Sequence, residues 1–270
     1  MTKRRVAAGL ILVGFLLTQP TQPLEALTSD STIGAQLPVQ TGGIEFVGEA
    51  SPGALVTFTR NGDVIGTQVA DGSSVFDDTF TNQSQGSATF GIFATDVSGR
   101  NTDLLTTTAT ILPAFTTILS GFLLPTTLRI VTNPIKRPQT EHIIGTTRQN
   151  STVTVFFSGT KYSDSFSVQT SSDALGNWDT TPGVFLHLGN YSVSAVVTEP
   201  GGNQSPQTTM QNITVTLSAD LNNDGRINLT DFSILMFYFN QSNVTKPADI
   251  NDDGKVNLTD FSIMLYYWTG

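Results

Sequence analysis

The chain has 270 residues, of which 13% are charged, and its net charge at pH 7 is −9. This excess of acidic groups disfavours nucleic acids and anionic membrane surfaces as partners. The chain contains no cysteine, which excludes disulfide bonds, so core packing and bound ions must stabilise its fold.

Residues 1–26 have the pattern of a secretory signal peptide. Basic Lys3, Arg4 and Arg5 precede a short apolar run, and a cleavage point follows Ala26. A membrane-spanning helix needs about 20 apolar residues, more than this run provides. We therefore expect a secreted protein, extracellular or at the cell surface, with no transmembrane span after cleavage. Whether the segment is cleaved or retained as an anchor stays open.

The middle of the chain has the short alternating segments of a mainly β fold. Residues 55–59 and 152–156 alternate β-branched or aromatic residues with Thr, and Asn61-Gly62 and Asp71-Gly72 mark turns. The pattern predicts a sandwich domain at 36–112, a connector at 113–127 and a second sandwich at 128–217. We expect the second sandwich to begin with a strand at 128–131.

An internal repeat of about one hundred residues relates the two predicted domains. Residues 71–76 match residues 173–178, and residues 95–101 match residues 198–203. This pattern resembles the bacterial immunoglobulin-like repeats of secreted surface proteins. The resemblance implies two tandem immunoglobulin-like β-sandwiches that serve as spacer or adhesion modules.

The C-terminal region contains one 12-residue pattern twice, at 220–231 and 249–260. Calcium takes six to eight oxygen ligands, and such a loop supplies them from positions 1, 3, 5, 7, 9 and 12 around a glycine at position 6. The residue at position 7 of each loop would contribute its backbone carbonyl oxygen, so a basic side chain at that position does not prevent calcium binding. Apolar Ile227 and Val256 at position 8 predict that the loops pair side by side. The pattern predicts two Ca²⁺ ions, with ligands from Asp220, Asn222, Asp224, Arg226, Asn228 and Asp231 and from Asp249, Asn251, Asp253, Lys255, Asn257 and Asp260.

These loops differ from EF-hands because no helix can enter either of them. A β-branched run precedes Asp220, and a short segment with Pro247 precedes Asp249. Each unit is thus a loop followed by one helix. Residues 218–270 resemble a type I dockerin module in this respect. The resemblance implies a calcium-stabilised module that binds a cohesin-like module on a partner protein.

The predicted helices after the loops are apolar on nearly every face. Such helices must be buried all round, yet two short helices cannot cover each other completely. We expect the remaining surface to bind the partner. An alternative is that the helices dock on the chain's own β-domain. The predicted partner-binding residues are Leu229, Thr230, Met236, Phe237, Leu258, Thr259, Leu265 and Tyr266.

No catalytic motif is present, so we expect a non-catalytic protein. The chain has two histidines and lacks a nucleophile elbow or a zinc-protease motif. The alternative function is an accessory role in polysaccharide catabolism, with sandwiches that bind glycan through Tyr162, Trp178 or Tyr191. The position of Trp178 in the repeat, where it matches Phe76, favours the core instead, and Tyr191 falls in an alternating strand, which favours a core or half-buried position.

Overall fold

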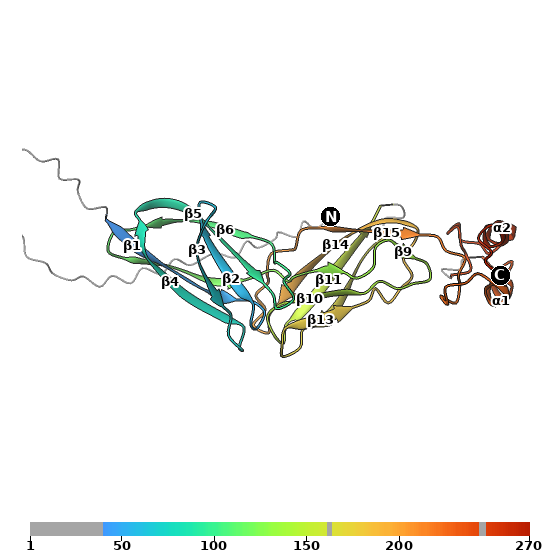
Figure 1. The fold of residues 1–270 in the computed structure, drawn as a ribbon, viewed down its shortest axis with the longest axis horizontal. Helices are drawn as coiled ribbons and strands as arrows, with labels where there is room; N and C mark the ends of the chain where they lie inside the picture. The colour runs from blue at the N-terminus through green and yellow to red at the C-terminus, as the bar shows by residue number, and fades with distance from the viewer. Residues whose placement is uncertain (1–39, 161–163, 243–246) are drawn as a thin grey trace, which may run out of the picture.

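The computed structural model describes residues 40–160, 164–242 and 247–270. The predicted signal peptide and Tyr162 lie outside these ranges. Three bodies follow one another along the long axis: two β-sandwiches and a small helical module (Figure 1). The mainly β fold class is thus confirmed. Among the described residues, no helix is long and apolar enough to cross a membrane.

Sandwich 1 packs a three-stranded sheet, β4-β1-β7, against a four-stranded sheet, β3-β2-β5-β6. Alternation of side chains places Phe46, Phe58, Phe76 and Phe90 between the sheets, where all four are buried. The strands are β1 (Thr41–Glu49), β2 (Leu55–Arg60), β3 (Asp63–Val69), β4 (Val75–Ser84), β5 (Gly86–Thr95), β6 (Leu105–Ile111) and β7 (Thr116–Leu123).

The segment predicted to be a connector, 113–127, contains the last strand of sandwich 1. Strand β7 pairs in parallel with β1, for example Phe46 with Leu119, so the connector prediction is wrong for this part. Leu119 is buried in the core. The pairing joins residues about 70 positions apart, which local alternation does not reveal.

Sandwich 2 has the sheets β13-β10-β8 and β12-β11-β14-β15-β9. Its core includes Phe157, Trp178 and Tyr191. The predicted first strand at 128–131 is present as β8. The strands are β8 (Arg129–Ile130), β9 (Ile135–Lys136), β10 (Ile143–Thr146), β11 (Thr152–Gly159), β12 (Ser165–Ser171), β13 (Asn177–Thr180), β14 (Gly189–Thr198) and β15 (Gln211–Thr216).

The two sandwiches meet through corresponding loops. Arg148 Nε donates to Glu49 Oε2 over 2.5 Å, the Gln149 amide donates to Ser74 Oγ over 3.0 Å, and the Thr209 amide donates to Asp103 over 2.5 Å. The loops after β1 and β10 correspond in the internal repeat, and both lie at this junction (Figure 1). The two sandwiches therefore contact each other through equivalent ends, the end of sandwich 1 that carries the loop after β1 and the end of sandwich 2 that carries the loop after β10.

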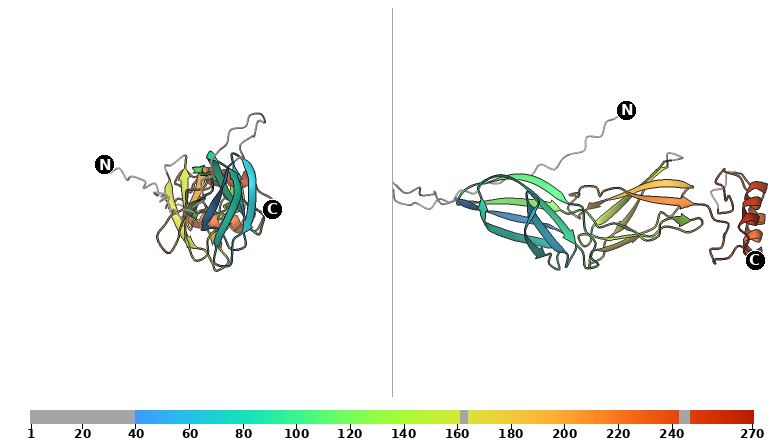
Figure 2. Two further views of the ribbon diagram at one scale, coloured as in Figure 1. Left: turned by 90° about the vertical axis from the view of Figure 1, so that its left-hand side faces the viewer. Right: turned by 45° about the horizontal axis from the view of Figure 1, so that its top comes forward.

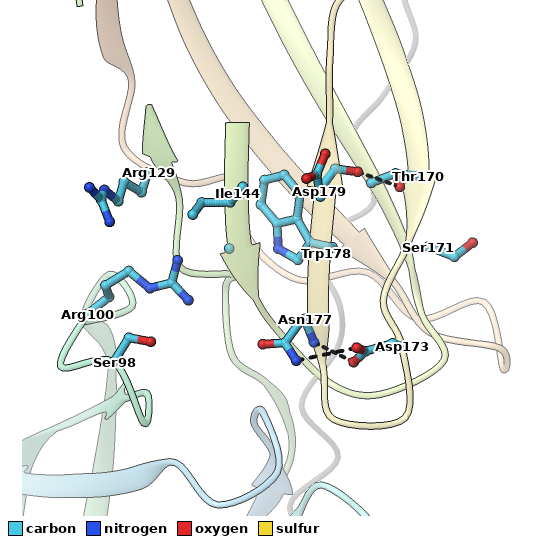
Figure 3. Close-up of a pocket in the computed structure, with 11 residues that line it drawn as sticks. Ser98, Arg100, Arg129, Ile144, Thr170, Ser171, Asp173, Asn177, Trp178 and Asp179 are labelled. Carbon is cyan, nitrogen blue, oxygen red and sulfur yellow. Dashed lines mark hydrogen bonds between the residues drawn. The ribbon is translucent and has the colours of Figure 1, made fainter. Parts of the chain in front are cut away.

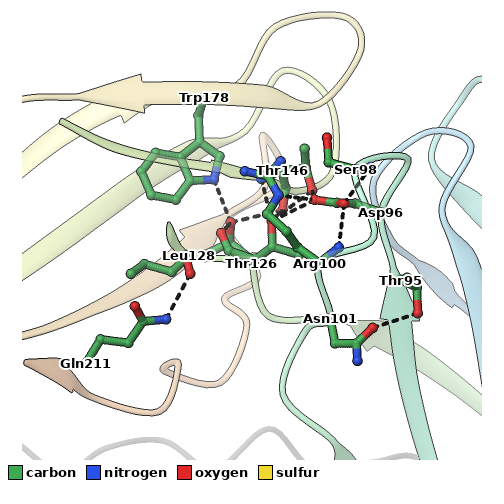
Figure 4. Close-up of polar contacts among 11 residues, drawn as sticks. Thr95, Asp96, Ser98, Arg100, Asn101, Thr126, Leu128, Thr146, Trp178 and Gln211 are labelled. Carbon is green, nitrogen blue, oxygen red and sulfur yellow. Dashed lines mark hydrogen bonds and ion pairs between the residues drawn. The ribbon is translucent and has the colours of Figure 1, made fainter. Parts of the chain in front are cut away.

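A buried polar network fills this junction (Figure 4). Asp96 accepts from the hydroxyl of Thr146 at 2.9 Å, from that of Thr127 at 3.2 Å and from Arg100 Nε at 2.6 Å. Burial alone would raise the pKa of Asp96, but the Arg100 amide, the Thr146 hydroxyl and the Arg100 guanidinium together hold that pKa below its usual value.

The helical module has α1 (Leu229–Tyr238) and α2 (Leu258–Tyr266), each beginning directly after a predicted calcium loop. Strand β15 precedes the first loop, as the sequence predicts. The two helices enclose a separate small core that includes Leu235, Val256 and Met264.

Candidate metal centre and docking face

The first half of each loop folds around the carboxylate at position 1. Asp220 accepts from the amide of Asp224 at 3.2 Å and from that of Gly225 at 2.9 Å. The second loop repeats the two contacts around Asp249 at 3.1 and 2.8 Å. Both position-6 glycines have φ of +87°, a left-handed conformation that favours glycine. Two different sequences thus form the same sharp turn.

Positions 3 and 5 lie against each other and against position 1. Asn222 Nδ2 donates to Asp224 Oδ2 over 2.9 Å, and Asn251 makes the same contact with Asp253 at 2.9 Å. The side chains of Arg226 and Lys255 at position 7 are exposed. This agrees with a role for their backbone carbonyls alone.

The last position of each loop connects the loop to its helix. Asp231 is fully buried and accepts from the amides of Leu221 at 2.7 Å, Asn222 at 3.2 Å and Asn228 at 2.9 Å. Asp260 repeats these bonds. Asn228 and Asn257 at position 9 are the helix N-caps, and each forms a capping box with the aspartate three residues later.

The charge balance of the loops favours a cation. Burial raises the pKa of Asp249, and the neighbouring carboxylates of Asp260 and Asp253 raise it further, against hydrogen bonds that lower it. Among the described residues, neither Asp231 nor Asp260 forms an ion pair with a basic side chain. A divalent cation would relieve this repulsion between carboxylates.

The donors suit calcium better than a metal that needs a cluster of histidine, cysteine or carboxylate ligands. Within the described ranges, no group of three or more His, Cys, Asp or Glu side chains is placed to hold a metal ion. The predicted ligand sets contain asparagine and backbone oxygens in addition to carboxylates. Such a mixed, oxygen-only set is what calcium prefers, so the residues fit that ion.

The position-8 residues pair with the segments after the helices and not with each other. The Asn240 amide donates to Val256 O over 2.7 Å, and the Thr269 amide donates to Ile227 O over 3.0 Å. The expectation that the loops pair side by side is therefore wrong. Each half instead closes on the loop of the other half, and Phe232 contacts Phe261 with ring centroids 5.6 Å apart.

All eight predicted partner-binding residues are exposed on the helices. Phe237 is 74% exposed and Tyr266 82%, while Leu229 and Leu258 are 70% and 68% exposed. Thr230, Met236, Thr259 and Leu265 are exposed as well. The helices lie at the far end of the module from sandwich 2 (Figure 2). The alternative that the helices dock on the chain's own β-domain does not agree with this arrangement.

The contacts between sandwich 2 and the module come from the loops instead. Asp252 meets Arg137 and His187, and Gln139 Nε2 donates to Asn223 Oδ1 over 3.2 Å. Asp252 is not among the residues predicted from the sequence to form the site. The available signal was loop position 4, where the two matching loops differ, with Asn223 in one and Asp252 in the other.

Two of the three aromatics considered for glycan binding, Trp178 and Tyr191, are not exposed. Trp178 is buried, and its Nε1 donates to Thr126 Oγ1 over 2.5 Å. Tyr191 is buried and donates to Asp164 Oδ2 over 3.1 Å. A groove of about 600 Å³ between the sandwiches is lined by Arg100, Arg129 and the edge of β13 (Figure 3). Its lining includes Trp178, but that side chain is committed to the core.

Comparisons with known proteins agree with this description of the module. The sequence profile of the dockerin type I domain matches residues 218–267. A search of curated proteins found no match.

Several solved structures of low similarity also match the chain. The chicken interferon gamma receptor alpha chain is 12% identical with a TM-score of 0.30, over 61% of this chain and 85% of the receptor chain. The fibronectin(III)-like modules of Clostridium thermocellum CbhA are 14% identical with a TM-score of 0.25, over 67% and 92%. A tetra-tandem repeat from the extending region of a large adhesion protein is 18% identical with a TM-score of 0.27, over 69% and 54%.

The two sandwiches are defined by their own packed sheets. For the module, the sequence profile covers both loops and both helices, whose geometry is described above. Residues 218–267 of this chain form a type I dockerin domain, which follows two β-sandwiches.

Proposed function

We propose that this chain is a secreted, non-catalytic docking protein. Its dockerin domain binds two Ca²⁺ ions, one in loop 220–231 and one in loop 249–260, and attaches the chain to a cohesin-like module of another protein. The two sandwiches act as spacer or adhesion modules outside the cell or at its surface. The observation that supports this most is the pair of loops with matching hydrogen bonds, each joined by a capping box to a helix whose outer face is apolar and exposed.

Calcium would supply positive charge at the point where the carboxylates of each loop repel one another. The chain's own residues do the rest of the work. Asp231 and Asp260 hold the last loop turn against the first helical turn through the amides of Asn228 and Asn257. Ordering a loop therefore also orders the start of the helix that presents the apolar face.

The experiment is a binding assay between the full chain and immobilised type I cohesin modules, run with calcium and with a chelator. We expect retention with calcium and its loss on chelation. Calorimetric titration of the chain with calcium should give a stoichiometry of two. A chain that binds no calcium, or that binds cohesins equally well in chelator, would contradict the proposal.

Glycan binding is not proposed as a second function. Of the three aromatics considered, Trp178 and Tyr191 belong to the core of sandwich 2, and Tyr162 lies outside the described residues. No observation on sandwich 1 or sandwich 2 favours a sugar over other ligands.

A further inference from the structure

Sandwich 2 holds the second calcium loop through one carboxylate. Asp252 stands at loop position 4, between the proposed ligands Asn251 and Asp253. Its Oδ1 accepts from Arg137 Nη1 at 2.7 Å and lies 2.8 Å from His187 Nδ1. Its Oδ2 accepts from the Leu188 amide at 2.9 Å. Both carboxylate oxygens are therefore bound by the neighbouring domain.

The residues that hold Asp252 are fixed within the body of sandwich 2. Arg137 follows β9, and its amide donates to Thr216 O at the end of β15 over 3.1 Å. His187 precedes β14, and its amide donates to the hydroxyl of the core residue Tyr191 over 2.9 Å. These two bonds connect the residues that receive Asp252 to strands β15 and β14 of the sandwich.

The ion pair at this contact is buried. The side chain of Arg137 is 5% exposed and that of Asp252 is 3% exposed. A bond between charged groups that are shielded from water is stronger and more geometrically selective than one at the surface. The contact therefore restricts where the second loop can lie.

The first loop is not held in this way. Its position 4 is Asn223, which has φ of 58°, close to the 59° of Asp252, so the two backbones are alike. Asn223 is exposed and accepts one bond, from Gln139. The two loops match at every proposed ligand type, but only the second has a charged anchor at position 4 in the adjacent domain.

We propose that Arg137 and His187 are positioning residues for the second calcium loop. By holding Asp252 they keep Asn251 and Asp253 in the calcium-binding arrangement before the ion arrives. Because coupling between two events is reciprocal, calcium in this loop also locks the dockerin domain in one orientation on sandwich 2. The inference rests on the proposed binding of calcium and adds that sandwich 2 takes part in it.

The test compares calcium titrations of the full chain and its Asp252→Asn variant. Asparagine tolerates the left-handed backbone and occupies this position in the first loop, so the change removes the charge and keeps the shape. Loss of a residue that orients metal ligands commonly weakens binding by about 10-fold to 100-fold. We expect one of the two calcium affinities to fall about ten-fold and the other to change by less than about two-fold.

Arg137→Met provides an independent variant, since it removes the partner and leaves the loop sequence intact. Arg137→Met should lower the same calcium affinity as Asp252→Asn. The double variant should bind calcium at that loop no more weakly than the single variant with the lower affinity. Gln139→Ala is the matched control, because it removes the contact to the first loop and should leave both affinities within about two-fold. Thermal unfolding in chelator checks that the sandwiches of each variant remain folded.

Small-angle X-ray scattering gives a readout that does not depend on affinity. Adding calcium should narrow the distribution of the radius of gyration of the wild-type chain. The distribution for the Arg137→Met chain should stay broad in calcium. If the wild-type chain binds no calcium, the proposed function fails. If it binds two ions and both variants titrate and scatter like wild type, the proposed function stands and the positioning role of Arg137 and His187 is overturned.

Discussion

At the scale of single residues, the buried aspartates at loop position 12 have two tasks. Asp231 and Asp260 each accept three backbone amides, and the bond from the amide of the N-cap asparagine closes a capping box at the start of the helix. A buried carboxylate is costly unless donors or a cation surround it. The same side chain therefore couples the folding of the loop, the start of the helix and the proposed calcium site.

Replacing Asp231 by Asn should remove one calcium ion and destabilise the module. The amide group cannot accept from three donors as the carboxylate does, so the free energy of unfolding in calcium should fall by about 2 kcal/mol. Calorimetry should give a stoichiometry of one instead of two. The exposed Asp63→Asn change in sandwich 1 is the control, and equal effects of the two changes would contradict the assignment.

Asp96 at the junction of the sandwiches should make stability depend on pH. Because its folded pKa lies below the unfolded value of about 3.9, its contribution is present above that pH and is lost as the pH falls through the folded pKa. Asp96→Asn should therefore lower the free energy of unfolding by about 2 kcal/mol near neutral pH. The difference from wild type should shrink below about pH 4 in denaturant titrations with chelator. A constant difference across this range would exclude the charge as its cause.

At the scale of elements, α1 and α2 have unequal faces. The inner faces place Leu235 and Met264 in the small core, and half-buried Phe232 and Phe261 pack between the helices. The outer faces leave large apolar groups in solvent, which is unusual unless a partner covers them. Each helix is too short to be stable alone, so its loop and cap must support it.

Charged residues on the outer faces should block docking and leave the fold intact. Combining Phe237→Glu with Tyr266→Glu places a charge on each helix at highly exposed positions, so folding should change little. Retention on a cohesin module should fall at least about 100-fold, as expected when buried aromatic contacts are lost. Val64→Glu on β3 is the matched control, since Val64 is 63% exposed on sandwich 1. Unchanged retention of the double variant would place the docking face elsewhere.

At the scale of the whole molecule, three bodies with separate cores are joined by polar contacts. The sandwiches meet through corresponding loops, and a glycine permits their close approach. Gly176 has φ of +80°, and a Cβ there would lie 2.2 Å from Thr147 O and 2.8 Å from Pro52 Cδ. The dockerin domain occupies one end of this row, with its helices outermost (Figure 1).

Chelation should unfold the dockerin domain and leave both sandwiches folded. Without an ion, the carboxylates of each loop repel one another, and the energy of metal binding is part of the folding energy of such a module. Circular dichroism should show loss of the helical signal in chelator and recovery with calcium, while the β-sheet signal persists. A melting profile insensitive to chelator would contradict the prediction.

Short-range patterns in the sequence were enough to predict the dockerin loops, the helices after them and the exposed residues on those helices. Ligand spacing, the glycine turn and the cap all act within about a dozen residues, so they can be recognised locally. The alternation of side chains likewise predicted strands and the burial of Tyr191, and the internal repeat predicted the burial of Trp178.

Only the tertiary structure decided which distant segments meet. The pairing of β7 with β1 and the burial of Asp252 against Arg137, which is 115 positions away, depend on how the sheets and domains pack. A strand can pair along either of its two edges, so its sequence does not select its neighbour. An aspartate in a loop can meet many basic residues, so spacing along the chain does not select its partner. The sequence by itself determined the predicted calcium loops and the helices after them, because their signals are local. The packing of the domains determined that one of these loops is anchored by its neighbour.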